Sequence, residues 1–247
     1  KIIINLKKKK KRKEQIFLMS KKIKKILFNG EEYPPETFRL GMMLCMVGGF
    51  MDAYTFITRG KVLANAQTGN IVYLAINLGK REWEKSFDYF MPILFFALGI
   101  LFTELIKTKF EKHKIFRWQQ IVIIYQVIVM FFISFIPSGN WNIIVNIIMS
   151  FIAAIQYQGF RKIRGLAGAT TMCTGNLRSG MDNLVKYIKT KDKSHLQSFW
   201  IYLGLDGFFL IGSLLCVILV NIYGIISLLI CCILLIFVFI IMFKKTI

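Results

Sequence analysis

Two short polar segments stand out in an otherwise apolar chain, because their residue types could bind a solute. Residues 64–78 read ANAQTGNIVYLAINL and residues 170–184 read TTMCTGNLRSGMDNL. The triplet TGN at 68–70 therefore recurs at 174–176, at an offset of 106 residues. Amide and hydroxyl side chains of this kind offer hydrogen bonds to a polar guest. They would equally satisfy backbone groups where a chain turns back inside a membrane.

Each triplet also resembles a helix start. Thr68 and Asn70 are residue types that cap helices, and the helix-capable stretch IVYLAINL follows them. Asn77 would then lie on the same face as Asn70, nearly two turns later. A half-helix that begins inside the membrane aims its positive end at the midplane, which favours a negatively charged or strongly polar guest.

Two aspartates fall inside apolar stretches, where an ionised side chain costs about 2.5–3.5 kcal/mol and normally faces a partner, a cavity or water. Asp52 follows Gly48-Gly49, and Asp206 lies in GLDGFF. One interpretation is a carboxylate that binds a proton or a solute. The other is that Asp52 caps or pairs locally near Arg59.

The second polar segment differs from the first by its charges. Arg178 and Asp182 replace Val72 and Ile76, and with Lys186 they form an i, i+4 series on one helix face. A cytoplasmic gate or an anion contact would suit Arg178, and so would a solvated face closed by an ion pair. The candidate solute-binding residues are Asp52, Asn65, Gln67, Thr68, Asn70, Asn77, Gln158, Thr174, Asn176, Arg178, Asp182 and Asn183. The candidate proton-coupling residues are Asp52 and Asp206.

Composition indicates the environment in which these residues must be positioned. The chain has 247 residues, 55% of them hydrophobic, which indicates an integral membrane protein with one membrane domain. Hydropathy predicts six transmembrane spans. They are Phe38 to Ile57, Tyr89 to Ile106, Trp118 to Ile136, Trp141 to Phe160, Phe199 to Val220, and Ile222 to Phe243.

The two polar segments are too short to cross the membrane with these spans. Residues 64–79 would form a helix of about 24 Å, whereas the hydrocarbon core is about 30 Å thick. Lysine and arginine collect in the cytoplasm, and the loop at 107–117 lies there only if each segment dips in and returns. We therefore expect an all-α bundle of six spans and two re-entrant or half-helix segments, with both termini cytoplasmic. Because each half crosses the membrane three times, an odd number, the second half starts on the opposite side from the first. We therefore expect 38–136 and 141–243 to be inverted repeats.

A basic arm precedes this domain. The net charge of +20 is concentrated in residues 1–37, which we interpret as a cytoplasmic arm near anionic lipid and not as a nucleic-acid binder. Met19-Ser20-Lys21 looks like a natural start, so residues 1–18 are a candidate misread upstream segment.

Three stretches resemble the YoaK-like family of bacterial inner-membrane proteins, a domain of unknown function with six predicted spans. They are GGFMDAYTF (48–56), LANAQTGNIV (63–72) and GATTMCTGNLRSGMDNL (168–184). The resemblance covers about Phe38 to Phe243. It implies a multi-pass protein of the bacterial cytoplasmic membrane, and no particular activity.

The leading functional hypothesis is a secondary transporter or permease for a small polar or anionic solute, coupled to protons through Asp52. The alternative is a non-transporting assembly, sensor or partner-binding module, in which the TGN segments only build the fold. An enzyme is not expected, because the chain has no nucleophile-base pair, metal cluster or cofactor motif. The expected partners are the lipid bilayer, the solute and a second copy of the chain in a homodimer.

Overall fold

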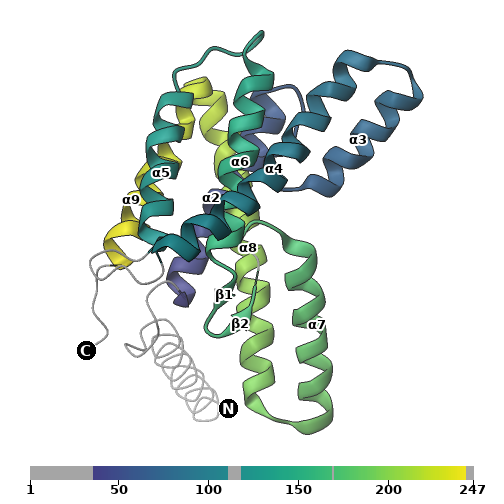
Figure 1. The fold of residues 1–247 in the computed structure, drawn as a ribbon. Coiled ribbons are helices and arrows are strands. Elements are labelled where there is room, and N and C mark those ends of the chain that lie inside the picture. Colours follow the sequence, from purple (N-terminus) through teal and green to yellow (C-terminus); the bar gives the residue numbers. More distant parts are fainter. Residues whose placement is uncertain (1–35, 111–117, 169, 243–247) are drawn as a thin grey trace, which may run out of the picture.

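The structure is a computed structural model that describes residues 36–110, 118–168 and 170–242 (Figure 1). These residues are mostly helical, as predicted. The elements are α2 (Phe38–Thr58), α3 (Gln67–Gly79), α4 (Trp83–Phe110), α5 (Trp118–Ile133), α6 (Asn142–Gly159), β1 (Lys162–Ile163), β2 (Leu166–Ala167), α7 (Cys173–Thr190), α8 (Lys193–Tyr223), the 3-10 helix η2 (Gly224–Leu228) and α9 (Leu229–Met242). The basic arm at residues 1–35 lies outside the described residues, as does most of the loop at 107–117.

Four helical stretches in the described part of the chain are long and apolar enough to cross a membrane. They are Phe38–Thr58, Trp83–Lys109, Asn142–Gly159 and Lys193–Met242. Helix α5 is apolar but shorter, at 16 residues. The last stretch has 50 residues, and Figure 1 shows that it reverses direction at η2, so that α8 and α9 run oppositely.

This reversal shifts the start of the last apolar helix. The sequence predicted a span from Ile222, whereas α9 begins at Leu229. Gly224 ends α8 with a φ of 60°, a left-handed conformation that favours glycine. Residues 224–228 then form the turn as a 3-10 helix.

Helix α2 is the central helix of the bundle. Its buried residues occur on every side, from Leu40 and Leu44 to Phe50 and Tyr54. It packs mainly on α8 and also contacts α9 and α6. A helix that is apolar all round and has its residues covered by neighbours is the expected form for a bundle centre.

Glycines allow α2 and α8 to cross closely. A Cβ added at Gly49 would lie 2.0 Å from the carbonyl oxygen of Phe209, and one at Gly212 would lie 2.0 Å from the carbonyl oxygen of Met46. Ser213 Oγ also donates to the Gly49 carbonyl at 3.0 Å. Small residues at the contact are the usual way in which membrane helices approach each other.

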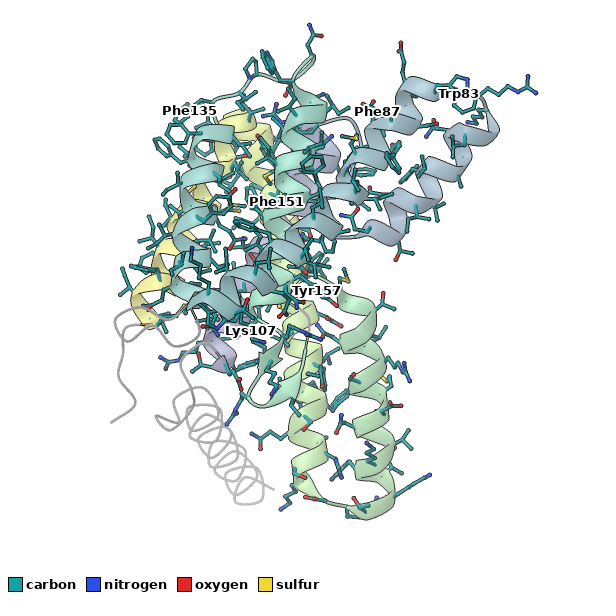
Figure 2. The ribbon with its side chains drawn as sticks, in the orientation of Figure 1. Trp83, Phe87, Lys107, Phe135, Phe151 and Tyr157 are labelled. Carbon is teal, nitrogen blue, oxygen red and sulfur yellow. The ribbon has the colours of Figure 1, made fainter. Side chains whose placement is uncertain are left out.

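Helix α4 crosses α6 in a similar way. A Cβ at Gly99 would lie 2.6 Å from the carbonyl oxygen of Phe151. The ring of Phe151 packs against Phe102 of α4 with 5.5 Å between centroids, and Tyr157 packs against Phe96 at 6.2 Å (Figure 2). Each of these two crossings therefore joins one helix of residues 38–133 to one helix of residues 142–242.

Helices α3 and α7 form hairpins with the helices that follow them. Helix α3 packs on α4, and α7 packs on α8. Figure 1 shows that both begin beside the middle of the bundle and run away from it in opposite directions. At 1.5 Å per residue, α3 is about 20 Å long and α7 about 27 Å, so each is shorter than the hydrocarbon core.

A small β-hairpin, which the all-α prediction did not include, joins α6 to α7. Lys162 pairs with Ala167 and Ile163 with Leu166. The two turn residues between the strands have positive φ angles of 54° and 74°, as a tight two-residue hairpin requires. Ile163 is fully buried and contacts α2 at Gly41, so the hairpin fixes the point where the chain re-enters the bundle.

Candidate functional site

Asp52 lies in α2 and holds the loop that leads into α3. Its Oδ1 accepts hydrogen bonds from the backbone N–H of Asn65 at 2.6 Å and from Asn65 Nδ2 at 3.3 Å. The Asn65 amide also donates to the carbonyl oxygen of Gly48 at 2.9 Å. Asp52 is 6% exposed and Asn65 is fully buried. After the end of α2, the chain therefore returns along that helix to the level of Gly48 and Asp52 before α3 begins.

The start of α3 is built differently from the cap that the sequence suggested. The helix begins at Gln67, and the residue before it, Ala66, has no capping side chain. Asn70 instead accepts from the Leu63 N–H at 3.0 Å and donates to the Leu63 carbonyl at 2.7 Å. The Asp52 carboxylate does not cap the first turn of α3, because the N–H group that it accepts from belongs to Asn65, two residues before the helix begins.

The start of α7 has its own carboxylate. Asn176 Nδ2 donates to Asp206 Oδ1 of α8 at 3.0 Å, and the thiol of Cys173 interacts electrostatically with Asp206. Asn176 is 2% exposed, whereas Asp206 is half-buried. Each of the two helix starts therefore faces a carboxylate from a neighbouring long helix, and each carboxylate opposes the positive end of a helix dipole.

The two helix starts meet at Gly48. A Cβ on this glycine would lie 2.8 Å from the carbonyl oxygen of Thr170 and 3.3 Å from the methyl group of Thr171. Cys173 lies within electrostatic range of both Asp52 and Asp206. The structure therefore brings together Asp52, Asn65, Asn176 and Asp206, which the sequence had marked on four separate stretches. We refer to these residues, with Gly48, Thr170, Thr171 and Cys173, as the central cluster.

Other predicted site residues lie outside the central cluster. Thr68 and Thr174 are exposed in the first turns of their helices. Asn77 and Asn183 each donate to the backbone four residues earlier in their own helices. Gln67 donates to the Ala64 carbonyl at 2.9 Å and accepts from Asn70, so it supports the loop before α3.

The charged residues of α7 also face away from the central cluster. Arg178 and Asp182 are exposed. The ion pairs found in the described part of the chain are Lys85–Glu82 and Lys107–Glu104, and neither involves α7. The sequence equivalent of Asp52, Gln158, donates to Glu104 of α4, on the helix end that also carries Lys107.

Arg59 is a buried residue whose position the sequence did not indicate. It is fully buried, and its guanidinium donates to the carbonyl oxygens of Ile136 at 2.8 Å and Pro137 at 3.0 Å and to the Tyr54 hydroxyl at 2.9 Å. Asn146 Nδ2 donates to the Arg59 carbonyl at 2.7 Å. The expected alternative, a local pair between Asp52 and Arg59, does not form, because Arg59 turns to the loop between α5 and α6.

A glutamine network crosses the bundle and was also not expected. Gln156 of α6 donates to the Leu44 carbonyl of α2 at 2.9 Å. Gln126 of α5 donates to the Ile152 carbonyl at 3.0 Å and to Gln156 Oε1 at 3.3 Å. These hydrogen bonds stabilise contacts of α6 with α2 and α5.

Long apolar helices, close glycine crossings and polar side chains gathered where two short helices begin define a helical integral membrane protein. The chain belongs to the family described as "Protein of unknown function (DUF1275)", whose family model matches residues 40–241. It is also similar to the UPF0700 transmembrane protein YoaK of Bacillus subtilis (strain 168), with 26% identity over 150 residues. That match covers 58% of this chain and 64% of the relative, slightly less than two thirds of its length. No solved structure matches the chain. The resemblance to YoaK-like proteins is confirmed.

Proposed function

We propose that this protein is a secondary transporter or permease for a small polar solute, which binds at the central cluster. The observation that carries the proposal is the meeting of two half-helix starts at Gly48, each facing a carboxylate inside the bundle. Transporters commonly place their sites where interrupted helices from two repeats meet near the bilayer midplane. Polar residues at such a depth are costly and normally serve a site.

The arrangement supports a topology of six crossings and two re-entrant segments. Helices α2, α4, α5, α6, α8 and α9 would cross, and α3 and α7 would enter from opposite faces and return. Figure 2 supports this assignment for one face, because Trp83 and Phe87 on the α3–α4 hairpin lie at the same end of the molecule as Phe135. Trp83 is 67% exposed, as expected for an aromatic residue at the membrane interface.

The packing pattern supports an inverted repeat. Exchanging α2 with α6, α3 with α7, α4 with α8, and α5 with α9 converts one set of contacts into the other. The α2–α8 contact becomes α6–α4, the α3–α4 contact becomes α7–α8, and the α5–α9 contact is unchanged. A pseudo-two-fold axis would therefore pass near the central cluster, where the equivalent residues Asn65 and Thr171 both approach Gly48.

The charges of the central cluster favour a polar guest over an anionic one. Asp52 and Asp206 already oppose the positive ends of α3 and α7, which would otherwise attract an anion. No lysine or arginine forms an ion pair with either aspartate in the described part of the chain. Asp206 is the better site for exchange of a proton with solution, because it is only half-buried.

The distribution of basic residues supports a cytoplasmic position for the end of the molecule that carries Lys107 and the β-hairpin. Arg161, Lys162 and Arg164 adjoin the hairpin, and Lys189, Lys191 and Lys193 lie at the α7–α8 turn. At the opposite end, Lys85 is paired with Glu82. By the positive-inside rule, α2 would begin and α9 would end at the cytoplasmic face of a bacterial cytoplasmic membrane.

Transport in liposomes tests the proposal. Purified protein should accumulate a radiolabelled polar solute under an imposed pH gradient, after candidate solutes have been selected by ligand-dependent thermal stabilisation. Asp206→Asn and Asn176→Ala should each lower the initial rate at least tenfold while the protein remains folded. Asp192→Asn, an exposed aspartate at the α7–α8 turn, is the matched control and should transport normally.

Two results would contradict the proposal. One is the absence of flux across a broad solute panel, which would favour the alternative of a non-transporting membrane module. The other is equal flux in the wild-type protein and in both variants, which would place the solute path away from the central cluster.

A further inference from the structure

Loops from the two halves of the chain meet at the backbone of Gly48. Asn65 donates to the Gly48 carbonyl at 2.9 Å. Thr170 and Thr171 approach so closely that a Cβ at position 48 would meet the Thr170 carbonyl at 2.8 Å. Asp52 lies one helical turn further along α2 and is bonded to the same Asn65. The carbonyl groups of Gly48 and Thr170, the Asp52 carboxylate and the Asn65 amide are therefore gathered around this turn of α2, and Thr170 and Thr171, each with a hydroxyl group, pack against it.

Three of these oxygen atoms are buried without a hydrogen-bond partner. They are Asn65 Oδ1, Thr170 Oγ1 and Thr171 Oγ1, and their residues are between 0% and 1% exposed. Asn65 uses its Nδ2 for Asp52 and Gly48, so that its oxygen is left for another group. Buried polar atoms without partners are rare in folded proteins, because each one has lost its hydrogen bonds to water. All three belong to residues that contact Gly48, which indicates a ligand that accepts electron pairs from oxygen.

The charge at this point also lacks a counter-ion. Asp52 is 6% exposed and receives hydrogen bonds from uncharged N–H groups. Within the described residues, no lysine or arginine forms an ion pair with it. A carboxylate that is buried without a basic partner requires a proton or a bound cation to offset its desolvation.

We propose that Asp52, Asn65, Thr170 and Thr171 form a binding site for a monovalent cation of the size of sodium. The role of this ion in coupling rests on the proposed transport function, whereas its binding does not. Oxygen ligands are those that hard cations prefer. The Thr170 carbonyl belongs to the non-helical segment before α7, and carbonyl groups of such segments beside half-helices are typical sodium ligands in membrane transporters.

The number of carboxylates favours a monovalent ion over a divalent one. Calcium sites usually collect several carboxylates. This site has one, because Asp206 is already bonded to Asn176. One negative charge and several neutral oxygens match an ion with one positive charge.

Thermal unfolding of the full chain in detergent tests the site. Sodium chloride should replace choline chloride at constant ionic strength, so that only the cation changes. We expect a saturable rise of several degrees in Tm with sodium, and a smaller one or none with potassium. Asp52→Asn and Thr171→Val should each abolish the rise.

Thr171→Val separates loss of the site from misfolding. The valine keeps the shape of the side chain and removes a hydroxyl group that has no partner, so its Tm in choline chloride should equal or exceed that of the wild-type protein. Thr190→Val is the matched control, because that threonine is exposed and its hydroxyl is bonded to the Lys186 carbonyl. It should keep the full response to sodium.

The proposal is overturned if the wild-type protein has the same Tm in sodium and choline, or if Thr171→Val responds like the wild-type protein. A response to acid with none to alkali cations would assign the Asp52 carboxylate to a proton and would also overturn it. A sodium response in a protein that moves no solute would keep this site and remove the transport proposal. Solute flux without a sodium response would keep the transport proposal and remove this cation site.

Discussion

Replacing Gly49 with alanine should destabilise the protein by about 1–3 kcal/mol, because the added methyl group overpacks the crossing of α2 and α8. The new Cβ would lie 2.0 Å from the Phe209 carbonyl oxygen and 2.9 Å from Ser213 Oγ. Ordinary contact begins near 3.4 Å, so the two helices must separate by about 1.4 Å at this point. The main-chain carbonyl cannot rotate away without breaking a helical hydrogen bond. The Ser213 hydrogen bond to the Gly49 carbonyl at 3.0 Å would be stretched as well.

Unfolding by SDS in mixed micelles, followed by circular dichroism, measures this effect. Gly207→Ala is the matched control, because it lies in α8, the partner helix of this crossing, and an added Cβ meets nothing within 4 Å. The control should be neutral or more stable by up to about 1 kcal/mol, since alanine favours helix more than glycine does. Equal stability of the two variants would refute the crossing. Asp52 lies three residues from Gly49, and Asp206 lies three residues from Phe209. Separation of the two helices would therefore move these aspartates apart, so Gly49→Ala should lower transport even in the fraction of protein that remains folded.

Three further predictions follow from groups away from the central cluster. Arg59→Lys should lower the free energy of unfolding by about 1.5–3 kcal/mol in the same assay, because a single ammonium group cannot reach both carbonyl groups of the α5–α6 loop. Arg81→Lys, at an exposed site, is the control, and an equal loss of stability in the two variants would contradict this role of Arg59. In a background without the native cysteines, Lys61→Cys and Arg81→Cys should react with an impermeant thiol reagent from one side of the membrane, and Lys191→Cys should react from the other side. Labelling of positions 61 and 81 from opposite sides would contradict a re-entrant α3. Hydrogen bonds from Ser194 lower the pKa of Asp192 below its ordinary value. The stability that Asp192 contributes is therefore fully present above about pH 4 and is lost as the pH falls through its folded pKa, so the Tm difference between the wild-type protein and Asp192→Ala should shrink on acidification below about pH 4.

Most of the helices could be predicted, because membrane helices are recognisable in a sequence by their length and hydropathy. All six predicted apolar stretches contain a helix, and α2 begins at the predicted Phe38. Helices α4 and α8 are longer than their predicted spans. Helix α4 packs on α3 and α8 packs on α7 in helical hairpins, and hydropathy alone does not detect the more polar starts of these two helices. The repeat of the TGN triplet also predicted equivalent helix starts, and α3 and α7 each begin one residue before it.

The sequence indicated which residue types belong to the candidate site, but it did not indicate which groups they hydrogen bond to. The unusual depth of Asp52 and Asp206 marked both as members of a site. The donors that they bind could not be inferred, because Asn65 reaches Asp52 only after the chain turns back along α2. Thr170 and Thr171 were overlooked for a related reason. Threonine is common in apolar helices and loops, and only burial without a hydrogen-bond partner distinguishes these two hydroxyl groups.

Arg59 shows why loop charges alone gave an incomplete account of the topology. If α2 starts in the cytoplasm, Arg59 lies with Lys61, Lys80 and Arg81 in a loop on the outer side, which conflicts with the positive-inside rule. In the structure Arg59 is fully buried, and its partners lie 77 and 78 residues away in the chain. A guanidinium that holds the end of α2 to the α5–α6 loop is a structural group, so it does not bear on orientation. On the same side of the membrane, the ion pair between Lys85 and Glu82 offsets one further positive charge. The conflict with the positive-inside rule is therefore smaller than the count of basic residues indicates, and the orientation with α2 starting in the cytoplasm is the one that the charges favour.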